Sequence, residues 1–264
     1  DGIRAENSDD EALGFIYIAG GDFDITAQGD GISAGYYLMI DNGSYNITTK
    51  GTGSDDSAKG LKAAGNLIVN DGTFTISTTD DGLHSNSDMS INGGSFTIAT
   101  GDDGLHADND LIINSGIIDI NDCYEGLEGL TITVNDGTIN INASDDGINA
   151  AGGTDSSGFG GFGHDAFSAD SDANIYINGG TITINADGDG IDSNGNLYVT
   201  GGIIYVSGPE SSADGALDYN GEATITGGTL IAAGASGMAE NFGSDSTQGS
   251  ILVTFTTQSA GTTI

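Results

Sequence analysis

The chain has 264 residues, including 46 glycines and one proline, and its 39 acidic side chains against four basic ones give a formal net charge of −35. This balance excludes nucleic acid as a partner, because binding phosphates needs a basic surface. A hydrophobic share of 36% that recurs in a regular pattern excludes a disordered acidic chain, and no stretch reaches the roughly 18 apolar residues of a membrane span. We therefore expect a folded protein without a membrane span, whose partners are cations or polymers bridged to it by cations.

A repeat of about 22 residues runs along the chain. Its first marker is a glycine that closes a Gly-Gly, Asn-Gly, Asp-Gly or Ser-Gly pair, at Gly21, Gly43, Gly72, Gly94, Gly116, Gly137, Gly180, Gly202 and Gly228. Apolar residues stand three places before and two and four places after it, as Ile91, Phe96 and Ile98 do around Gly94, with polar residues between them. This alternation predicts a tight turn between two strands that each bury one face.

A second marker, an acid followed by glycine and an apolar residue, keeps step with the first. It begins at Asp1, Asp30, Asp81, Asp103, Glu125, Asp146, Asp189 and Asp214, and Lys59 replaces the acid in one repeat. Each repeat thus reads as strand, glycine turn, strand and acidic turn. A unit of this length fits one coil of a parallel β-helix, which buries its apolar face by stacking on its neighbours. We predict a single all-β domain over residues 1–264, a parallel β-helix of about nine coils.

Two segments depart from the repeat. An insertion over 151–163 contains Phe159 and Phe162 in a glycine-rich stretch, and it predicts a mobile loop whose two rings are candidate carbohydrate contacts. The last stretch, 249–264, leaves the pattern and is predicted to cap the stack, because an uncovered edge would recruit another strand.

An asparagine two places before the turn glycine predicts a row of amides. It is present in five repeats, as Asn70, Asn92, Asn114, Asn135 and Asn178. Side-chain amides at the same corner of successive coils can hydrogen-bond along the stack, so we predict an asparagine ladder.

Stacking at about 4.8 Å places the acids of successive turns in columns. Two unit charges at this spacing repel by roughly 0.9 kcal/mol in bulk water and about 3.5 kcal/mol at an effective dielectric constant of 20. Such a column must either point fully into water or contain cations. Carboxylate, amide and carbonyl oxygens suit Ca²⁺, which takes roughly six to eight of them, so we predict several calcium ions. The predicted ligand sets are Asp80, Asp81, Asp102 and Asp103; Asp122, Glu125, Asp145 and Asp146; and Asp187, Asp189, Asp192 and Asp214.

His84 and His106 occupy one column on successive coils, and Glu128 follows them. Imidazole suits zinc or copper, so a transition-metal site is one interpretation. We favour the other, that two surface histidines recur because the coil recurs.

The Asp-Gly-Ile and Gly-Gly-Thr-Ile repeats resemble those of the bacterial cell-surface, calcium-binding β-helix proteins that bind cellulose and acidic sugars, relatives of the family 9 pectate lyases. The resemblance runs from Asp1 to about Gly237. It implies a right-handed helix, several bound calcium ions, a secreted or surface-attached protein, and binding of plant cell-wall polysaccharide such as cellulose or polygalacturonate. We expect a monomer.

A calcium-dependent lyase is the alternative function that this resemblance raises. Such an enzyme needs a lysine that removes the proton beside the uronate carboxylate, and Lys62 is the candidate base. Nearby carboxylates raise the pKa of a lysine, which opposes that role. We therefore predict that Lys59 and Lys62 neutralise acids and that the protein binds polysaccharide without cleaving it.

Neutral glucans are bound through aromatic rings and polar rows, and Tyr176, Tyr198 and Tyr205 are the candidate contacts. The chain has no tryptophan, which weakens the case for a flat aromatic cellulose platform. A structural surface spacer is the third function, and no sequence feature separates a spacer from a glycan binder.

Overall fold

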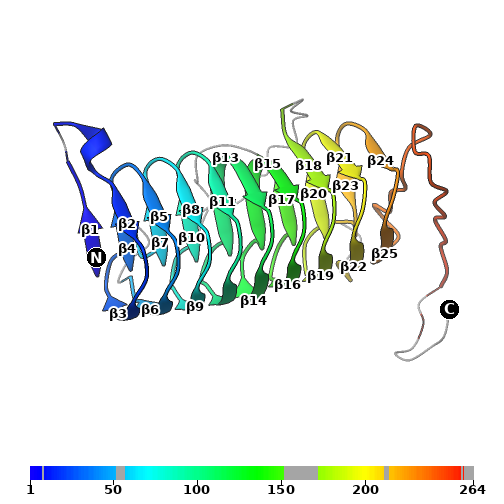
Figure 1. Cartoon of the computed structure of the whole chain (residues 1–264). Helices are drawn as coiled ribbons and strands as arrows, with labels where there is room; N and C mark the ends of the chain where they lie inside the picture. The colour runs from blue at the N-terminus through cyan, green and yellow to red at the C-terminus, as the bar shows by residue number, and fades with distance from the viewer. Residues whose placement is uncertain (8, 52–56, 152–171, 211–213, 257, 259–264) are drawn as a thin grey trace.

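The structure, a computed structural model, describes residues 1–7, 9–51, 57–151, 172–210, 214–256 and 258. The strands wind around one long axis, with the first coil at one end and the last at the other (Figure 1). One sheet has 16 strands and the other has nine, and the described pairings between strands are parallel. The predicted parallel β-helix of about nine coils, each of about 22 residues, is confirmed.

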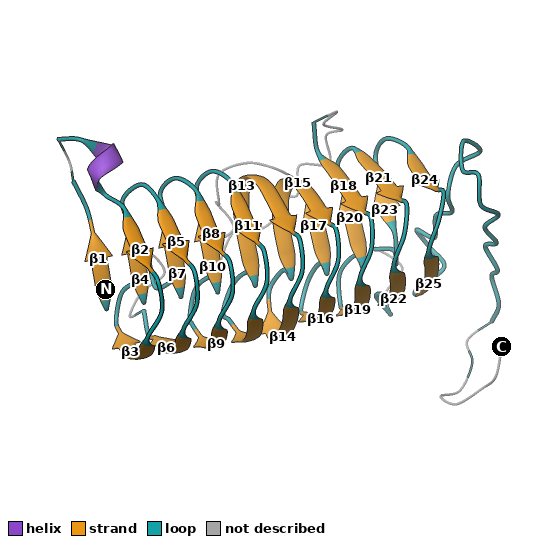
Figure 2. Ribbon diagram, in the orientation of Figure 1, coloured by secondary structure: helices purple, strands orange, loops and turns teal. Residues whose placement is uncertain are grey.

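Each coil contributes three strand positions (Figure 2). The first position, after the acidic turn, holds β1 (Ile3–Ala5), β4 (Ile32–Ala34), β7 (Leu61–Ala63), β10 (Leu83–Ser85), β13 (Leu105–Ile113), β15 (Leu127–Val134), β17 (Ile148–Ala150), β20 (Ile191–Ser193) and β23 (Asp218–Tyr219). The second holds β2 (Ile16–Ile18), β5 (Leu38–Ile40), β8 (Leu67–Val69), β11 (Met89–Ile91), β18 (Asn174–Ile177), β21 (Asn196–Val199) and β24 (Ala223–Ile225), and β13 and β15 run through both positions. The third holds β3 (Asp22–Ala27), β6 (Ser44–Thr49), β9 (Thr73–Ser77), β12 (Ser95–Ala99), β14 (Ile117–Cys123), β16 (Thr138–Ala143), β19 (Thr181–Ala186), β22 (Ile203–Ser207) and β25 (Thr229–Ala233). One turn of 3-10 helix, η1 (Glu11–Leu13), lies near the N-terminus.

The prediction of two strands per repeat is wrong, because a third strand follows the acidic turn. In β10 this strand is Leu83, His84 and Ser85, and all three side chains are buried. Three residues are too few to show a period, and the buried polar residue in the middle hides the alternation. The acidic turn therefore leads directly into the strand that carries the polar residues of the site.

The core is built from columns of similar side chains. The rings of Phe23, Tyr45, Phe74 and Phe96 stack with centroids 4.6 to 4.9 Å apart and interplanar angles of 4°. Isoleucine fills the same position on the next coils, beginning with Ile118. Each coil thus buries its apolar row against the coils above and below, as expected of a repeat protein.

The two glycine markers arise from different steric causes. Gly94 has a φ of +101°, a left-handed conformation that only glycine adopts readily, so it makes the tight turn. Gly104 is needed for space, because a Cβ there would lie 2.5 Å from the carbonyl oxygen of Gly126 and 2.6 Å from Cδ1 of Ile120.

Replacing Gly104 by alanine is therefore expected to destabilise the fold by about 1–3 kcal/mol, the usual cost of forcing an extra carbon into a packed interior. The measurement is the urea unfolding midpoint of Gly104→Ala. Gly249→Ala is the matched control, because a Cβ at that position meets nothing within 4 Å. Equal unfolding midpoints for both variants would show that the neighbouring coils can accommodate an extra carbon at Gly104 without loss of stability.

The asparagine ladder is confirmed. The Nδ2 of Asn92 donates to Oδ1 of Asn70 at 2.8 Å, and the same bond recurs on each later coil of the row. At the first coil of the row, Nδ2 of Asn70 donates to the carboxylate of Asp41 at 2.7 Å. At the other end, the hydroxyl of Thr200 donates to Oδ1 of Asn178 at 2.8 Å.

The structure describes the two segments outside the repeat to different extents. Residues 152–163 of the insertion, including Phe159 and Phe162, lie outside the described residues. Near the C-terminus, Gly243 and Gln248 donate backbone hydrogen bonds to β24. The described residues after position 248 contain no strand, and Ile251 is 87% exposed. The cap over 249–264 stays a prediction. Within the described residues, no helix is long and apolar enough to cross a membrane.

Candidate metal and carbohydrate site

The acids of the turns form a column that is buried over most of its length, and most of them accept a backbone N–H of the next coil with one oxygen. Oδ1 of Asp81 accepts the N–H of Asp103 at 3.1 Å, and Oδ1 of Asp103 accepts the N–H of Glu125 at 3.2 Å. The same bond recurs from Asp1 to Asp30, from Asp30 to Lys59, from Asp146 to Asp189 and from Asp189 to Gly215. The acids are therefore structural connectors, and their second oxygens remain for a proton, a protein cation or a metal ion.

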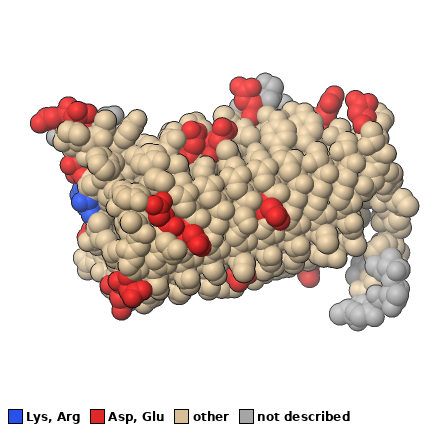
Figure 3. Space-filling model, in the orientation of Figure 1, with Lys and Arg blue, Asp and Glu red and all other residues tan. Residues whose placement is uncertain are grey.

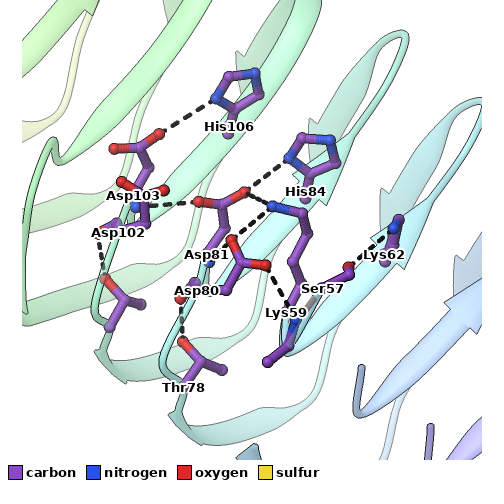
Figure 4. Close-up of polar contacts among 12 residues, drawn as sticks. Ser57, Lys59, Lys62, Thr78, Asp80, Asp81, His84, Asp102, Asp103 and His106 are labelled. Atoms are coloured by element: carbon purple, nitrogen blue, oxygen red, sulfur yellow. Dashed lines mark hydrogen bonds and ion pairs between the residues drawn. The ribbon is translucent and has the colours of Figure 1, made fainter. Parts of the chain in front are cut away.

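Near the N-terminal end of this column the cation is a lysine (Figure 4). The ammonium of Lys59 lies 2.7 Å from Oδ1 of Asp80 and 2.5 Å from Oδ2 of Asp81, and the lysine is 6% exposed. Burial acts to lower the pKa of Lys59, but the charges of Asp81 and Asp80 outweigh it and raise that pKa above its usual value. Burial likewise acts to raise the pKa of Asp81, but the hydrogen bond from His84 and the charge of Lys59 hold it below its usual range.

Lys62, the candidate lyase base, lies beside an acid. Its ammonium donates to the hydroxyl of Ser57 at 2.9 Å and lies 3.7 Å from Oδ2 of Asp30. Both lysines thus act as counterions to the first acids of the column.

The first predicted calcium set is divided between two groups. Oxygens of Asp80, Asp81 and Asp102 lie within 4.8 Å of one another. Asp103 turns instead toward His106, whose Nδ1 lies 3.3 Å from Asp103 Oδ2. The corresponding neighbours Asp80 and Asp81 stay in one group, because both contact the ammonium of Lys59.

The second predicted set is not brought together. No three of Asp122, Glu125, Asp145 and Asp146 place ligand atoms within 4.8 Å of one another in the described structure. Glu125 accepts a hydrogen bond of 3.0 Å from Nδ2 of Asn149 instead. Burial raises the pKa of Glu125 well above its usual value, and the nearby charges of Glu128 and Asp103 act in the same direction.

The third predicted set is brought together in part. Asp189 and Asp192 place oxygens within 4.8 Å of each other and of Asp146, whereas Asp187 and Asp214 do not join this cluster. We refer to Asp146, Asp189 and Asp192 as the aspartate cluster. It joins two adjacent coils, since Asp192 lies in β20 and Asp146 precedes β17.

Two acids of the aspartate cluster, Asp146 and Asp189, are held in surroundings that disfavour their negative charge. Burial raises the pKa of Asp146 well above its usual value, and the charges of Asp145 and Asp192 add to the effect. Burial also raises the pKa of Asp189 to about 7, and the carboxylates of Asp218 and Asp214 act in the same direction. A divalent cation at this position would offset both effects.

The interpretation of His84 and His106 as surface residues is wrong. His84 is 2% exposed and His106 is 1% exposed, and their rings stack with centroids 4.8 Å apart. The sequence suggested surface residues because the two histidines recur only at the interval of the coil, and the buried strand that carries them was not predicted. These buried rings hydrogen-bond to acids of the turn, with His84 Nδ1 2.8 Å from Asp81 Oδ2.

The candidate aromatic contacts are divided between two faces. Tyr176 and Tyr198 stack on successive coils, with centroids 5.1 Å apart and an interplanar angle of 14°. Tyr205 belongs to the other sheet, in register with Thr183 and Ile231, because the glycine turn at Gly202 separates it from β21. The three tyrosines therefore do not form one platform.

A groove that sequence reasoning missed crosses three coils at the glycine turns. It has a volume of about 460 Å³ and is lined by Ser115, Gly116, Ile117, Asp136, Gly137, Thr138, Gly180 and Thr181. Hydroxyl groups, one carboxylate and an exposed isoleucine give it the mixed polar and apolar character of a sugar-binding surface. The recurrence of glycine at successive turns is the sequence feature that could have indicated this groove. On the side of the molecule shown in Figure 3, acids lie in separate small groups on a largely uncharged surface.

Comparison with protein families gives a match along nearly the whole chain. The profile of a family described as "Carbohydrate-binding domain-containing protein" matches residues 1–104 and 102–260. No curated protein and no solved structure matches significantly. The open groove and the stacked tyrosines are surfaces on which a carbohydrate could lie, in agreement with this family description. The chain therefore belongs to the family of carbohydrate-binding domain-containing proteins.

Proposed function

We propose that this protein binds an acidic cell-wall polysaccharide, such as polygalacturonate, through calcium held by the aspartate cluster, and that it does not cleave the polymer. The observation that carries the proposal is the convergence of Asp146, Asp189 and Asp192 from two coils, at a place where burial opposes the negative charges of Asp146 and Asp189. We further propose that the protein acts outside the cell, where this polymer is found.

The aspartate cluster fits calcium by its donors. All of them are carboxylate oxygens, which suit Ca²⁺. One oxygen of Asp146 and one of Asp189 accept backbone hydrogen bonds, so these two residues can each offer the other oxygen. Calcium takes roughly six to eight ligands, and the protein would leave several positions for water or a uronate carboxylate. Asp189 and Asp192 are partly exposed, which places those positions on the solvent side.

The positions of the basic residues support binding without cleavage. All four lie at or before Lys62 in the sequence. Lys62 and Asp192 occupy the same column five coils apart, from β7 to β20, a separation of about 24 Å at the spacing of paired strands. A base must lie within hydrogen-bond reach of the proton that it removes, so Lys62 cannot serve a uronate held at the aspartate cluster.

A neutral glucan such as cellulose is the second ligand class that the surface supports. The stacked rings of Tyr176 and Tyr198 offer an apolar surface along the stack. The groove at Gly116, Gly137 and Gly180 offers hydroxyl groups at coil spacing. Neither feature depends on calcium, so cellulose binding would persist in chelator.

The binding experiment is a pull-down on polygalacturonate and on cellulose, each with calcium and with chelator, and ultraviolet absorbance of the supernatant reports unsaturated uronide. We expect calcium-dependent retention on polygalacturonate without absorbance. Asp192→Asn is expected to weaken retention at least about ten-fold, because it removes a charged ligand, whereas the exposed Asp22→Asn is the control and should bind normally.

Each other result would contradict a defined part of the proposal. Appearance of uronide would reverse the non-catalytic assignment and make Lys62 the first residue to replace. Calcium-dependent retention that Asp192→Asn leaves intact would place the bridging ion elsewhere. Retention on neither polymer would leave a structural spacer.

A further inference from the structure

The motif Asp-Asp-Gly-Leu-His occurs on two successive coils, and the two copies differ in their cation. In the first copy, the ammonium of Lys59 lies 2.5 Å from Oδ2 of Asp81, which also contacts Nδ1 of His84. In the second copy the register partner of His106 on the next coil is Glu128, an additional acid. Lys59 on the preceding coil aligns with Asp81, whereas Glu128 on the following coil aligns with His106, so stacking gives the two copies different charged neighbours.

In the second copy, three carboxylates surround one imidazole. Nδ1 of His106 lies 3.3 Å from Oδ2 of Asp103 and also faces Oε2 of Glu128, while Nε2 lies 3.2 Å from Oδ1 of Asp108. An N–H on Nδ1 points in one direction and cannot be shared fully by two carboxylates. Within the described structure Oε2 of Glu128 is enclosed from solvent and accepts no hydrogen bond of good geometry.

Among the described residues, no lysine or arginine forms an ion pair with the three carboxylates of this cluster, and their one basic partner is the imidazole of His106. Asp103 and His106 are 0% and 1% exposed, so bulk water does not screen their charges. All four basic residues of the chain precede it, and the nearest of them along the stack, Lys59, is held by Asp80 and Asp81. A cation that balances the cluster would have to come from solution.

We propose that Asp103, His106 and Glu128 bind a first-row transition-metal cation, and zinc is the ion used in the argument and in the test. Two ligands that are each about 2.1 Å from a tetrahedral zinc ion lie roughly 3.4 Å apart, and His106 Nδ1 and Asp103 Oδ2 are 3.3 Å apart. Oε2 of Glu128 lies closer to Nδ1 than this spacing, so its carboxylate would move outward when the ion enters. Ligand atoms of all three residues lie within 4.8 Å of one another. Asp108 accepts a hydrogen bond from the other ring nitrogen, which fixes the orientation of the imidazole and leaves Nδ1 for the ion.

The donor set distinguishes this site from the aspartate cluster. A nitrogen ligand favours zinc and its neighbours, whereas calcium prefers oxygen alone. The bound ion would join β13 to β15, the two strands that run through both the first and second positions of a coil. It would thus hold together the middle of the stack, independently of any polysaccharide.

The test is metal content and affinity measured on the full chain. Protein is stripped with chelator under unfolding conditions, refolded with zinc sulfate or cobalt chloride, dialysed, and analysed by mass spectrometry of the metal. We expect one zinc per chain and, with cobalt, the intense visible bands of a low-symmetry site. His106→Gln should lose the ion. Asp108→Asn should weaken binding by about 10–100-fold, as is typical when the hydrogen-bond partner of a metal-binding histidine is replaced.

His84→Gln is the matched control, because it alters the copy of the motif that already contains lysine. Zinc content unchanged in this variant and lost in His106→Gln supports the assignment. Equal loss in both variants would overturn it in favour of a site between the two rings. No zinc retained by the refolded native chain would also overturn it. Circular dichroism identifies a variant that fails to fold, and Glu128→Gln then provides the ligand test in its place.

Discussion

Removal of calcium is expected to lower the melting temperature of this protein by roughly 5–11 °C for each ion released. An ion present at a hundred times its dissociation constant stabilises the fold by about 2.7 kcal/mol, and each kcal/mol shifts the melting temperature by about 2–4 °C in a domain of this size. The expected site is the aspartate cluster, where Asp146 is buried beside Asp189 and Asp192. The measurement is a thermal melt in calcium and in excess chelator.

The pH dependence of the chelated protein tests the same cluster. A carboxyl group whose pKa is raised on folding favours the folded state most at a pH below its unfolded pKa, and that contribution is lost as the pH rises through the folded pKa. For Asp189 the folded pKa is about 7. In chelator the melting temperature should therefore fall between about pH 4 and pH 7, and calcium should reverse the trend.

Asp189→Asn separates this explanation from a general effect of charge. The variant should lose most of the calcium response and should melt no lower than the native chain in chelator, because it removes a repelled anion. The exposed Asp22→Asn should behave as the native chain does. An identical melt with and without chelator would remove calcium from the description of this fold.

Truncating the centre of the aromatic column is expected to have the largest effect of any single core substitution considered. Phe74 is 1% exposed and is stacked between Tyr45 and Phe96, with centroids 4.6 Å apart on both sides. Phe74→Ala would remove a ring from a packed interior at a cost of about 3–5 kcal/mol. At about 2–4 °C for each kcal/mol, the melting temperature should fall by roughly 6–20 °C.

Two variants show whether the loss comes from the cavity. Phe74→Ile should be milder, since Ile118 and Ile139 occupy the same column on later coils. Phe15→Ala should change stability by no more than about 0.5 kcal/mol, because Phe15 is 55% exposed. A similar loss in Phe15→Ala and Phe74→Ala would show that the aromatic column has no special role.

Most of the coil could be predicted from the sequence because each of its features recurs at a fixed interval. Gly94 with its flanking Phe96 and Ile98 gives both the turn and the buried face of the strand after it. The amide row followed from the recurrence of asparagine two places before the turn glycine, as at Asn92. The strand at Leu83–Ser85 could not be predicted, because it is too short to show a period and its central histidine is buried.

The candidate site was harder to predict, since the sequence gives columns but not the direction of each side chain. Asp102 and Asp103 are neighbours in the chain, yet they join different groups. The sequence also could not show that one oxygen of Asp103 is used by the backbone of the next coil. The partner of the second oxygen, His106, was assigned to the surface, because the buried strand that carries it was not predicted.

The asparagine ladder has an electrostatic polarity. Every amide from Asn92 to Asn178 donates toward the preceding coil, so the side-chain dipoles add along the row instead of cancelling. Their positive end lies at Asn70, where the carboxylate of Asp41 accepts the last hydrogen bond, as an anion does at the amino end of an α-helix. Hydrogen-bonded chains of this kind polarise one another. A coil added by duplication would extend the row in the same sense and strengthen it without a new anion at its end.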